Sequence, residues 1–199
     1  ILALVDASHL TMAALLHRRA REYGGKVLFE VPTPGSPRSL TWRQTAARVE
    51  ALARGLIGVA GSSAPRVAII SENRLEMALT DLACQAAGLV SVMIPAQATE
   101  SDVAFMLRQS EAGLAIAGSK EILATLKRLA EGLPALSRLA CMDVPLAGNG
   151  VLSLDEIAAR AGETPVAELE RRRLEARASD LTTIMYTSGT TGTPKGICF

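Results

Sequence analysis

The sequence has 199 residues and a formal net charge of +1, with 49% hydrophobic and 21% charged residues, a balance typical of a globular domain. The near-neutral charge excludes a general electrostatic attraction to nucleic acid, and the 3% of aromatic residues argue against a base-stacking surface. No apolar run approaches the roughly 20 residues that a membrane-spanning helix requires.

The first part of the chain predicts two helices with a strand between them. Residues Leu10–Tyr23 form the first expected helix, with Ser8 as its N-cap, and Val27–Val31 form a short strand. The prolines that follow this strand indicate a turn. Thr41 and Gln44 then have the spacing of a capping box, and the helix after them carries an apolar stripe at Ala46, Val49, Ala53, Leu56 and Ile57.

From residue 66 onward, short apolar runs alternate with helical patterns. The runs predicted to be strands are Arg66–Ile70, Leu89–Ile94, Leu114–Ala117 and Leu136–Met142. The predicted helices are Glu72–Ala87 with Ser71 as its N-cap, Val103–Ser110 after a capping box that starts at Thr99, Ser119–Glu131, Leu154–Ala161 after Ser153, and the charged stretch Glu168–Arg177. This alternation predicts an α/β fold, with a mostly parallel sheet flanked by helices. We expect the three arginines at 171–173 to lie on a solvated helix face, because acidic residues are interleaved with them.

The cysteines and histidines do not suggest a metal site. Cys84, Cys141 and Cys198 share no short spacing and lie in apolar segments, so we expect buried free thiols, which fits a reducing cytoplasm. His9 and His17 are expected on the surface of the first helix.

The segment Tyr186–Gly196, with the sequence Tyr-Thr-Ser-Gly-Thr-Thr-Gly-Thr-Pro-Lys-Gly, is the most informative part of the chain. Its glycines allow the backbone to approach a ligand closely, and successive amides can form a concave anion site to which Lys195 adds a positive charge. Pro194 before the lysine and Gly196 after it differ from the Walker pattern, which argues against a kinase-like P-loop. The other interpretation is a flexible linker, but the flanks Leu181–Tyr186 and Ile197–Phe199 have the pattern of buried strands.

This segment resembles the signature loop of the adenylate-forming enzymes, which include acyl-CoA synthetases, luciferases and peptide-synthetase adenylation domains. The resemblance continues through Leu40–Trp42, Arg66–Arg74, Gly88–Pro95 and Asp180–Tyr186, and it is strongest to long-chain fatty acyl-CoA synthetases; Ala96-Gln97-Ala98 departs from their pattern. The resemblance implies an N-terminal α/β subdomain at residues 1–178 and the start of the next sheet at 179–199, with an ATP phosphate-binding loop at 186–196. Since the chain begins at Ile and ends within an expected strand, we expect a fragment of a longer protein.

The resemblance also implies roles for individual residues. It places the residues of the loop against the β- and γ-phosphates of ATP: Thr187, Ser188, Gly189, Thr190, Thr191, Gly192 and Lys195. Lys195 would be the catalytic residue, as an electrostatic clamp on the pyrophosphate that leaves. Thr187 would contact the magnesium ion that ATP carries.

The function implied by the resemblance is that of an ATP-dependent fatty acid–CoA ligase, an acid–thiol ligase. Such an enzyme converts a carboxylate to acyl-AMP and transfers the acyl group to coenzyme A, using ATP and Mg²⁺. We expect the coenzyme A site to lie mostly outside this chain and the fragment by itself to be inactive. A fatty acyl-AMP ligase, an amino-acid adenylation domain and a non-catalytic ATP-binding module remain alternatives. A cytoplasmic location is expected, with peripheral membrane association left open and no nucleic acid as a partner.

Overall fold

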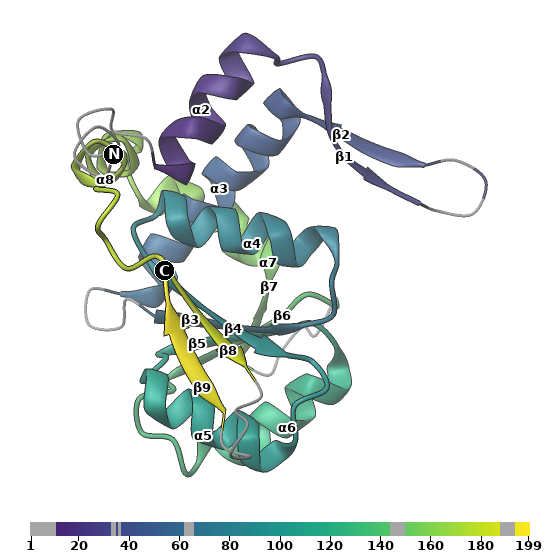
Figure 1. The fold of residues 1–199 in the computed structure, drawn as a ribbon, viewed down its shortest axis with the longest axis vertical. Helices are drawn as coiled ribbons and strands as arrows, with labels where there is room; N and C mark the ends of the chain where they lie inside the picture. Colours follow the sequence, from purple (N-terminus) through teal and green to yellow (C-terminus); the bar gives the residue numbers. More distant parts are fainter. Residues whose placement is uncertain (1–10, 33–34, 36, 62–65, 144–149, 188–193) are drawn as a thin grey trace.

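A seven-stranded sheet forms the centre of the structure (Figure 1). The computed structural model describes residues 11–32, 35, 37–61, 66–143, 150–187 and 194–199. The strand order is β7-β6-β5-β3-β4-β8-β9, and all neighbouring strands are parallel except β8 and β9. The strands are β3 (Arg66–Ser71), β4 (Val90–Pro95), β5 (Leu114–Ala117), β6 (Arg138–Cys141), β7 (Val151–Ser153), β8 (Thr183–Thr187) and β9 (Lys195–Cys198). The predicted α/β fold with a mostly parallel sheet is confirmed.

Helices cover both faces of this sheet. The first face carries α3 (Trp42–Ala60), α4 (Leu75–Ala86) and α7 (Leu154–Ala159), and a 3-10 helix, η1 (Arg160–Glu163), continues α7. The second face carries α5 (Glu100–Ser110) and α6 (Lys120–Ala130). Two further helices pack against α3 and α4: α2 (Met12–Glu22) and α8 (Val166–Glu175).

Strand β3 shows why the sheet is buried on both faces. Val67 and Ile69 belong to the core beneath α3 and α4, whereas Ala68 and Ile70 belong to the core beneath α5 and α6. All four side chains are at most 1% exposed. A strand between two helical layers needs an apolar side chain at every position, which is why this run shows no alternation.

The packing of α3 on α7 depends on one glycine. A Cβ atom at Gly55 would lie 1.8 Å from the carbonyl oxygen of Ile157. Backbone atoms cannot move aside as a flexible side chain can. Gly55 therefore sets the distance between the two helices.

The predicted capping box at Thr41 is confirmed: the Thr41 hydroxyl accepts from the Gln44 amide, and the Gln44 side chain accepts from the Thr41 amide. Ser153, predicted as an N-cap, caps α7 and forms the same reciprocal pair with Glu156. Of the predicted box at Thr99 one half is found, since the Thr99 hydroxyl accepts from the Asp102 amide at 3.2 Å.

Two predicted N-caps are wrong. The first helix of the described residues, α2, begins at Met12 with Thr11 as its N-cap, rather than Ser8. Ser71 does not cap α4, because β3 continues through Ser71 and the helix starts only at Leu75.

The N-terminal strand pairs outside the main sheet. β1 (Val27–Val31) and β2 (Arg38–Thr41) form an antiparallel two-stranded ribbon, which projects from the body of the molecule in Figure 1. β2 and the short strand β7 were not predicted, since each is too short to show a clear pattern in the sequence.

The expectation of a new sheet after residue 178 is wrong for the described strands. β8 pairs in parallel with β4, and β9 pairs antiparallel with β8, so both extend the existing sheet. The pairing of Ser91 with Thr183 joins segments that are far apart in sequence, which a reading along the chain could not detect. The division into domains at residue 178 stays a prediction.

Cys84 and Cys141 are buried free thiols as expected, but Cys198 is exposed. The reason is that β9 is the edge strand of the described sheet. His17 is an exposed residue of α2, as predicted, although one side of it borders a cavity between helices, and His9 lies outside the described residues.

The expectation of a fully solvated arginine run is only partly correct. The Arg171 side chain is 51% exposed, whereas those of Arg172 and Arg173 are 28% and 20% exposed. Arg172 donates a hydrogen bond of 2.9 Å to the carbonyl oxygen of Ala87 at the C-terminus of α4. A guanidinium group suits that position because the last carbonyls of a helix lack partners within it.

Candidate functional site

The candidate site lies where β8 ends and β9 begins. The register pairs Tyr186 with Gly196 and Thr187 with Lys195, so the two legs of the predicted phosphate loop are adjacent (Figure 1). Directly opposite residues of an antiparallel pair have Cα atoms about 4.5–5.5 Å apart. The structure thus brings Thr187 and Lys195 together, and both residues are exposed. The other predicted site residues lie outside the described residues: Ser188, Gly189, Thr190, Thr191 and Gly192.

Tyr186 anchors this hairpin to the second helical layer. Its side chain is 8% exposed, and its hydroxyl donates to Oε1 of Gln109 at 2.9 Å, with the carbonyl oxygen of Met106 at 3.3 Å as a second acceptor for the same proton. Both acceptors belong to α5. Burial raises the pKa of Tyr186, which keeps the hydroxyl protonated and able to donate at neutral pH.

The returning strand packs closely on the same ring. A Cβ atom at Gly196 would lie 3.3 Å from two ring carbons of Tyr186 and 3.2 Å from Cγ2 of Ile184. These distances are shorter than ordinary van der Waals contacts. A residue without a side chain at 196 therefore lets the tyrosine ring pack against β9.

A polar cluster holds the other end of β8. Ser91 of β4 donates from its hydroxyl to Oδ1 of Asp81 at 2.6 Å, and its Oγ is 3.1 Å from Oγ1 of Thr183. The Ser91 amide also donates to the carbonyl oxygen of Thr182 at 2.9 Å. β8 is therefore fixed at its start by Ser91 and near its end by Tyr186.

A depression of about 480 Å³ lies beside the described legs of the loop. α5 contributes Phe105 and Gln109 to its lining, and the hairpin contributes Ile184, Pro194, Lys195, Gly196 and Cys198. It combines an aromatic ring, an amide and an ammonium group. These groups can bind a ligand that has both apolar and anionic parts.

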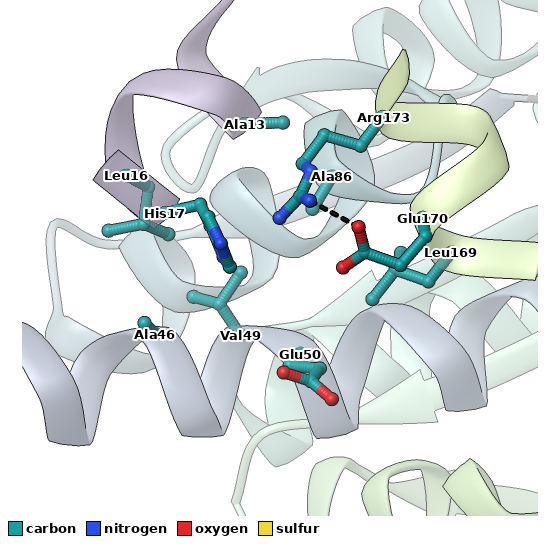
Figure 2. Close-up of a pocket in the computed structure, with 10 residues that line it drawn as sticks. All are labelled: Ala13, Leu16, His17, Ala46, Val49, Glu50, Ala86, Leu169, Glu170 and Arg173. Atoms are coloured by element: carbon teal, nitrogen blue, oxygen red, sulfur yellow. Dashed lines mark hydrogen bonds and ion pairs between the residues drawn. The ribbon is translucent and has the colours of Figure 1, made fainter. Parts of the chain in front are cut away.

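A second, smaller cavity of about 60 Å³ lies among α2, α3, α4 and α8 (Figure 2). His17 and the Arg173–Glu170 ion pair are near apolar side chains there. Burial and the nearby Arg173 charge lower the pKa of His17, which favours its neutral form. The cavity is a gap between helices that carry no residue of the predicted loop.

Neither a protein metal site nor a membrane span is present in the described part of the chain. No group of three His, Cys, Asp or Glu side chains is close enough there to hold a metal ion. None of the helices described is long and apolar enough to cross a bilayer. A magnesium contact of Thr187 stays a prediction.

Comparison with known proteins identifies the family. Residues 16–199 match the family model described as AMP-binding enzyme, and the chain belongs to this family. Among curated relatives, the chain is 31% identical over 188 residues to the long-chain-fatty-acid–CoA ligase FadD15 of Mycobacterium bovis, covering 94% of this chain and 31% of that protein. It is 28% identical over 184 residues to a linear gramicidin synthase of Brevibacillus parabrevis, covering 92% of this chain and 3% of that protein.

Solved structures support the same fold. The anthranilate CoA ligase AuaEII in complex with anthranoyl-AMP aligns with a TM-score of 0.78 at 22% identity, over 95% of this chain and 34% of that one. The N-terminal domain of FACL13 from Mycobacterium tuberculosis aligns with a TM-score of 0.67 at 24% identity, over 94% of this chain and 44% of that one. The chain thus spans about a third of the length of the FadD15 relatives.

Proposed function

We propose that this chain is the N-terminal part of an ATP-dependent ligase that joins a carboxylate to AMP. The observation that carries the proposal is the pairing of Thr187 with Lys195 at the mouth of a loop rich in glycine and hydroxyl groups. That pairing brings the two ends of this segment, Thr187 and Lys195, next to each other. Membership of the AMP-binding family supports the proposal.

The side chains of Thr187 and Lys195 suit a polyphosphate ligand. Thr187 supplies a hydroxyl and Lys195 an ammonium group, and solvent reaches both residues. Lys195 donates only, so it suits the oxygens of an anion. Each charge-assisted hydrogen bond to such a ligand contributes about 1.5–3 kcal/mol.

These residues would act by electrostatic stabilisation. When a carboxylate attacks the α-phosphate of ATP, negative charge accumulates on the departing pyrophosphate. A cation and donors that already face those oxygens stabilise this charge without rearranging. Lys195 would serve as that cation, and the Thr187 hydroxyl could supply one oxygen to a magnesium ion bound with ATP.

We propose a fatty acid as the carboxylate and coenzyme A as the acceptor. The support is the FadD15 relatives, whose name states this activity and which match 94% of the chain. The gramicidin synthase match keeps an amino-acid adenylation domain as an alternative. A relative from Arabidopsis thaliana, named as a long-chain-fatty-acid–[acyl-carrier-protein] ligase, favours a second alternative in which the acceptor is a different thiol.

The test is release of pyrophosphate by the full-length protein with MgATP and a panel of fatty acids and amino acids, with and without coenzyme A. We expect turnover with fatty acids and a thioester only when coenzyme A is present. Acyl-AMP that accumulates unchanged by coenzyme A would favour the acyl-AMP ligase alternative. MgATP binding without pyrophosphate release from any acid would favour the non-catalytic module. The isolated 199-residue chain is expected to be inactive.

A cytoplasmic location belongs to the same proposal. Fractionation of cells that express the tagged full-length protein tests it. Recovery in the membrane pellet, reversed by high salt, would indicate the peripheral association.

A further inference from the structure

We propose that Gln109 is a positioning residue for the phosphate loop, acting through the hydroxyl of Tyr186. This inference rests on the proposed function, because it assigns the loop to ATP. Gln109 lies 77 positions before Tyr186 in the sequence and on a different layer of the fold. Neither the loop motif nor any pattern around Gln109 indicates the contact.

The contact between Gln109 and Tyr186 lies next to both ends of the loop, Thr187 in β8 and Lys195 in β9. Tyr186 is the residue immediately before Thr187, and its strand partner Gly196 immediately follows Lys195. The ring of Tyr186 lies against Gly196, so a shift of the ring displaces both strands. Its hydroxyl is the point at which this assembly is hydrogen-bonded to α5.

Gln109 is the better placed of the two acceptors that compete for the single hydroxyl proton of Tyr186. Its Oε1 lies at 2.9 Å, against 3.3 Å for the Met106 carbonyl, and distances near 2.7–2.8 Å are most common for hydroxyl donors. The Met106 carbonyl also belongs to the backbone of an α-helix and cannot turn toward the ring. Gln109 therefore sets the direction of the hydroxyl.

The helix that carries Gln109 is itself held in place. Nη1 of Arg66 in β3 donates to the carbonyl oxygen of Ser110 at 3.0 Å, one residue beyond Gln109. At the other end of α5, Glu100 forms an ion pair of 2.7 Å with Arg128 of α6. α5 can thus act as a fixed support.

Gln109 also lines the 480 Å³ depression that Lys195 lines. The amide that orients Tyr186 and the proposed catalytic ammonium group therefore border the same space. A change at Gln109 affects the side of the hairpin that faces this depression. This is the geometric reason to expect an effect on ATP rather than on stability alone.

The test compares four forms of the full-length protein: wild type, Tyr186→Phe, Gln109→Met and the double variant. Tyr186→Phe keeps the ring against Gly196 and removes only the hydroxyl. Gln109→Met keeps the length of the side chain and removes the acceptor. The matched control is Gln44→Met, which removes a side-chain amide that accepts from the Thr41 backbone amide at 2.9 Å on α3, a helix of the other layer.

We expect each single variant to raise the KM for MgATP about three- to tenfold, the range that one hydrogen bond supplies. The KM for the carboxylate should not change, and neither should either KM in Gln44→Met. The double variant should be no worse than Tyr186→Phe, because both changes break the same contact. A purely structural role would instead lower the active fraction, which reduces kcat and leaves both KM values unchanged.

Two results would overturn the inference. One is a KM for MgATP within twofold of wild type in both single variants. The other is a double variant in which the increases in the KM for MgATP caused by the two single changes multiply. Calorimetric titration with MgATP supplies the affinity independently of any acid. If wild type neither binds MgATP nor releases pyrophosphate, the proposed function and this inference both fail; if it does both and the variants match it, only the inference fails.

Discussion

Arg74 and Asp143 connect the ends of distant strands on one edge of the sheet. Nη1 of Arg74 donates to Oδ1 of Asp143 at 2.8 Å and to the carbonyl oxygen of Gly118, also at 2.8 Å. Nε of the same side chain donates to Glu76 at 2.9 Å. One guanidinium thus links the segments that follow β3, β5 and β6.

This arrangement predicts a stability that depends on pH. Burial of Glu76 opposes ionisation, but hydrogen bonds from Arg74 and Arg38 outweigh it and lower the pKa of Glu76. Its stabilising contribution is therefore present at pH values above the ordinary carboxyl pKa and is lost as the pH falls through the lowered one. Urea unfolding of wild type and Glu76→Gln across this range should show a difference at neutral pH that shrinks in acid. A difference that stays constant with pH would contradict the assignment.

Removing the other carboxylate should also cost stability. Asp143→Asn leaves an amide that bonds a guanidinium more weakly, and the Asp143 side chain is 41% exposed. With solvent screening included, we expect a loss of about 1 kcal/mol in the free energy of unfolding. Asp155→Asn, at an exposed position in the first turn of α7, is a suitable control with a smaller expected effect.

Gly55 and Gly58 form a matched pair on α3. The Cβ of Gly55→Ala would meet the Ile157 carbonyl at 1.8 Å, so we expect a loss of at least about 3 kcal/mol in unfolding free energy. The Cβ of Gly58→Ala would be 3.7 Å from its nearest atom, an ordinary contact. Alanine favours helix over glycine, so this variant should gain about 0.5–1 kcal/mol. Equal thermal stability of the two variants would refute the close-packing argument.

Gly196→Ala should disturb the loop as well as the fold. Its added methyl group would press on the Tyr186 ring, which the hydrogen bonding of its hydroxyl to α5 prevents from moving away freely. We expect a loss of about 1–3 kcal/mol in stability and a higher KM for MgATP. Gly162→Ala is the control, since nothing within the described residues lies within 4 Å of its added methyl group. Normal ATP kinetics in Gly196→Ala would count against the role given to this contact.

Lys195→Ala tests the proposed clamp in the full-length protein. Loss of one charge-assisted contact should lower kcat/KM for acyl-AMP formation by about 10- to 150-fold. Lys127→Ala, an exposed lysine in the last turn of α6, should be near wild type. Unchanged acyl-AMP formation by Lys195→Ala would remove Lys195 from the mechanism.

The sequence was informative wherever a structural requirement is local. The capping box at Thr41, the N-cap at Ser153 and the buried run in β3 follow from neighbouring residues, and the structure confirms them. The chemistry of the loop was equally readable, because glycine, hydroxyl groups and a lysine lie together in the chain. Of the residues predicted to contact phosphate, the structure places Thr187 and Lys195 side by side.

Non-local features could not be read in this way. The pairing of β8 with β4 depends on the Ser91–Thr183 contact between positions 92 residues apart. The contact of Gln109 with Tyr186 likewise has no signature near either residue. Ser71 was misassigned for a related reason: a Cβ at Gly118 would lie 2.5 Å from its Oγ, so the end of β5 packs against Ser71 from a distance along the chain.

The late position of β8 in the sequence has a consequence for biosynthesis. Its partner β4 is synthesised first, together with β3, β5, β6 and β7, so β8 and β9 are the last strands available to the sheet. Contacts over such long separations form late in folding. Because Lys195 lies in β9, we expect ATP to bind only after the last strand has been synthesised. A chain that ends before β9 should therefore have no affinity for ATP.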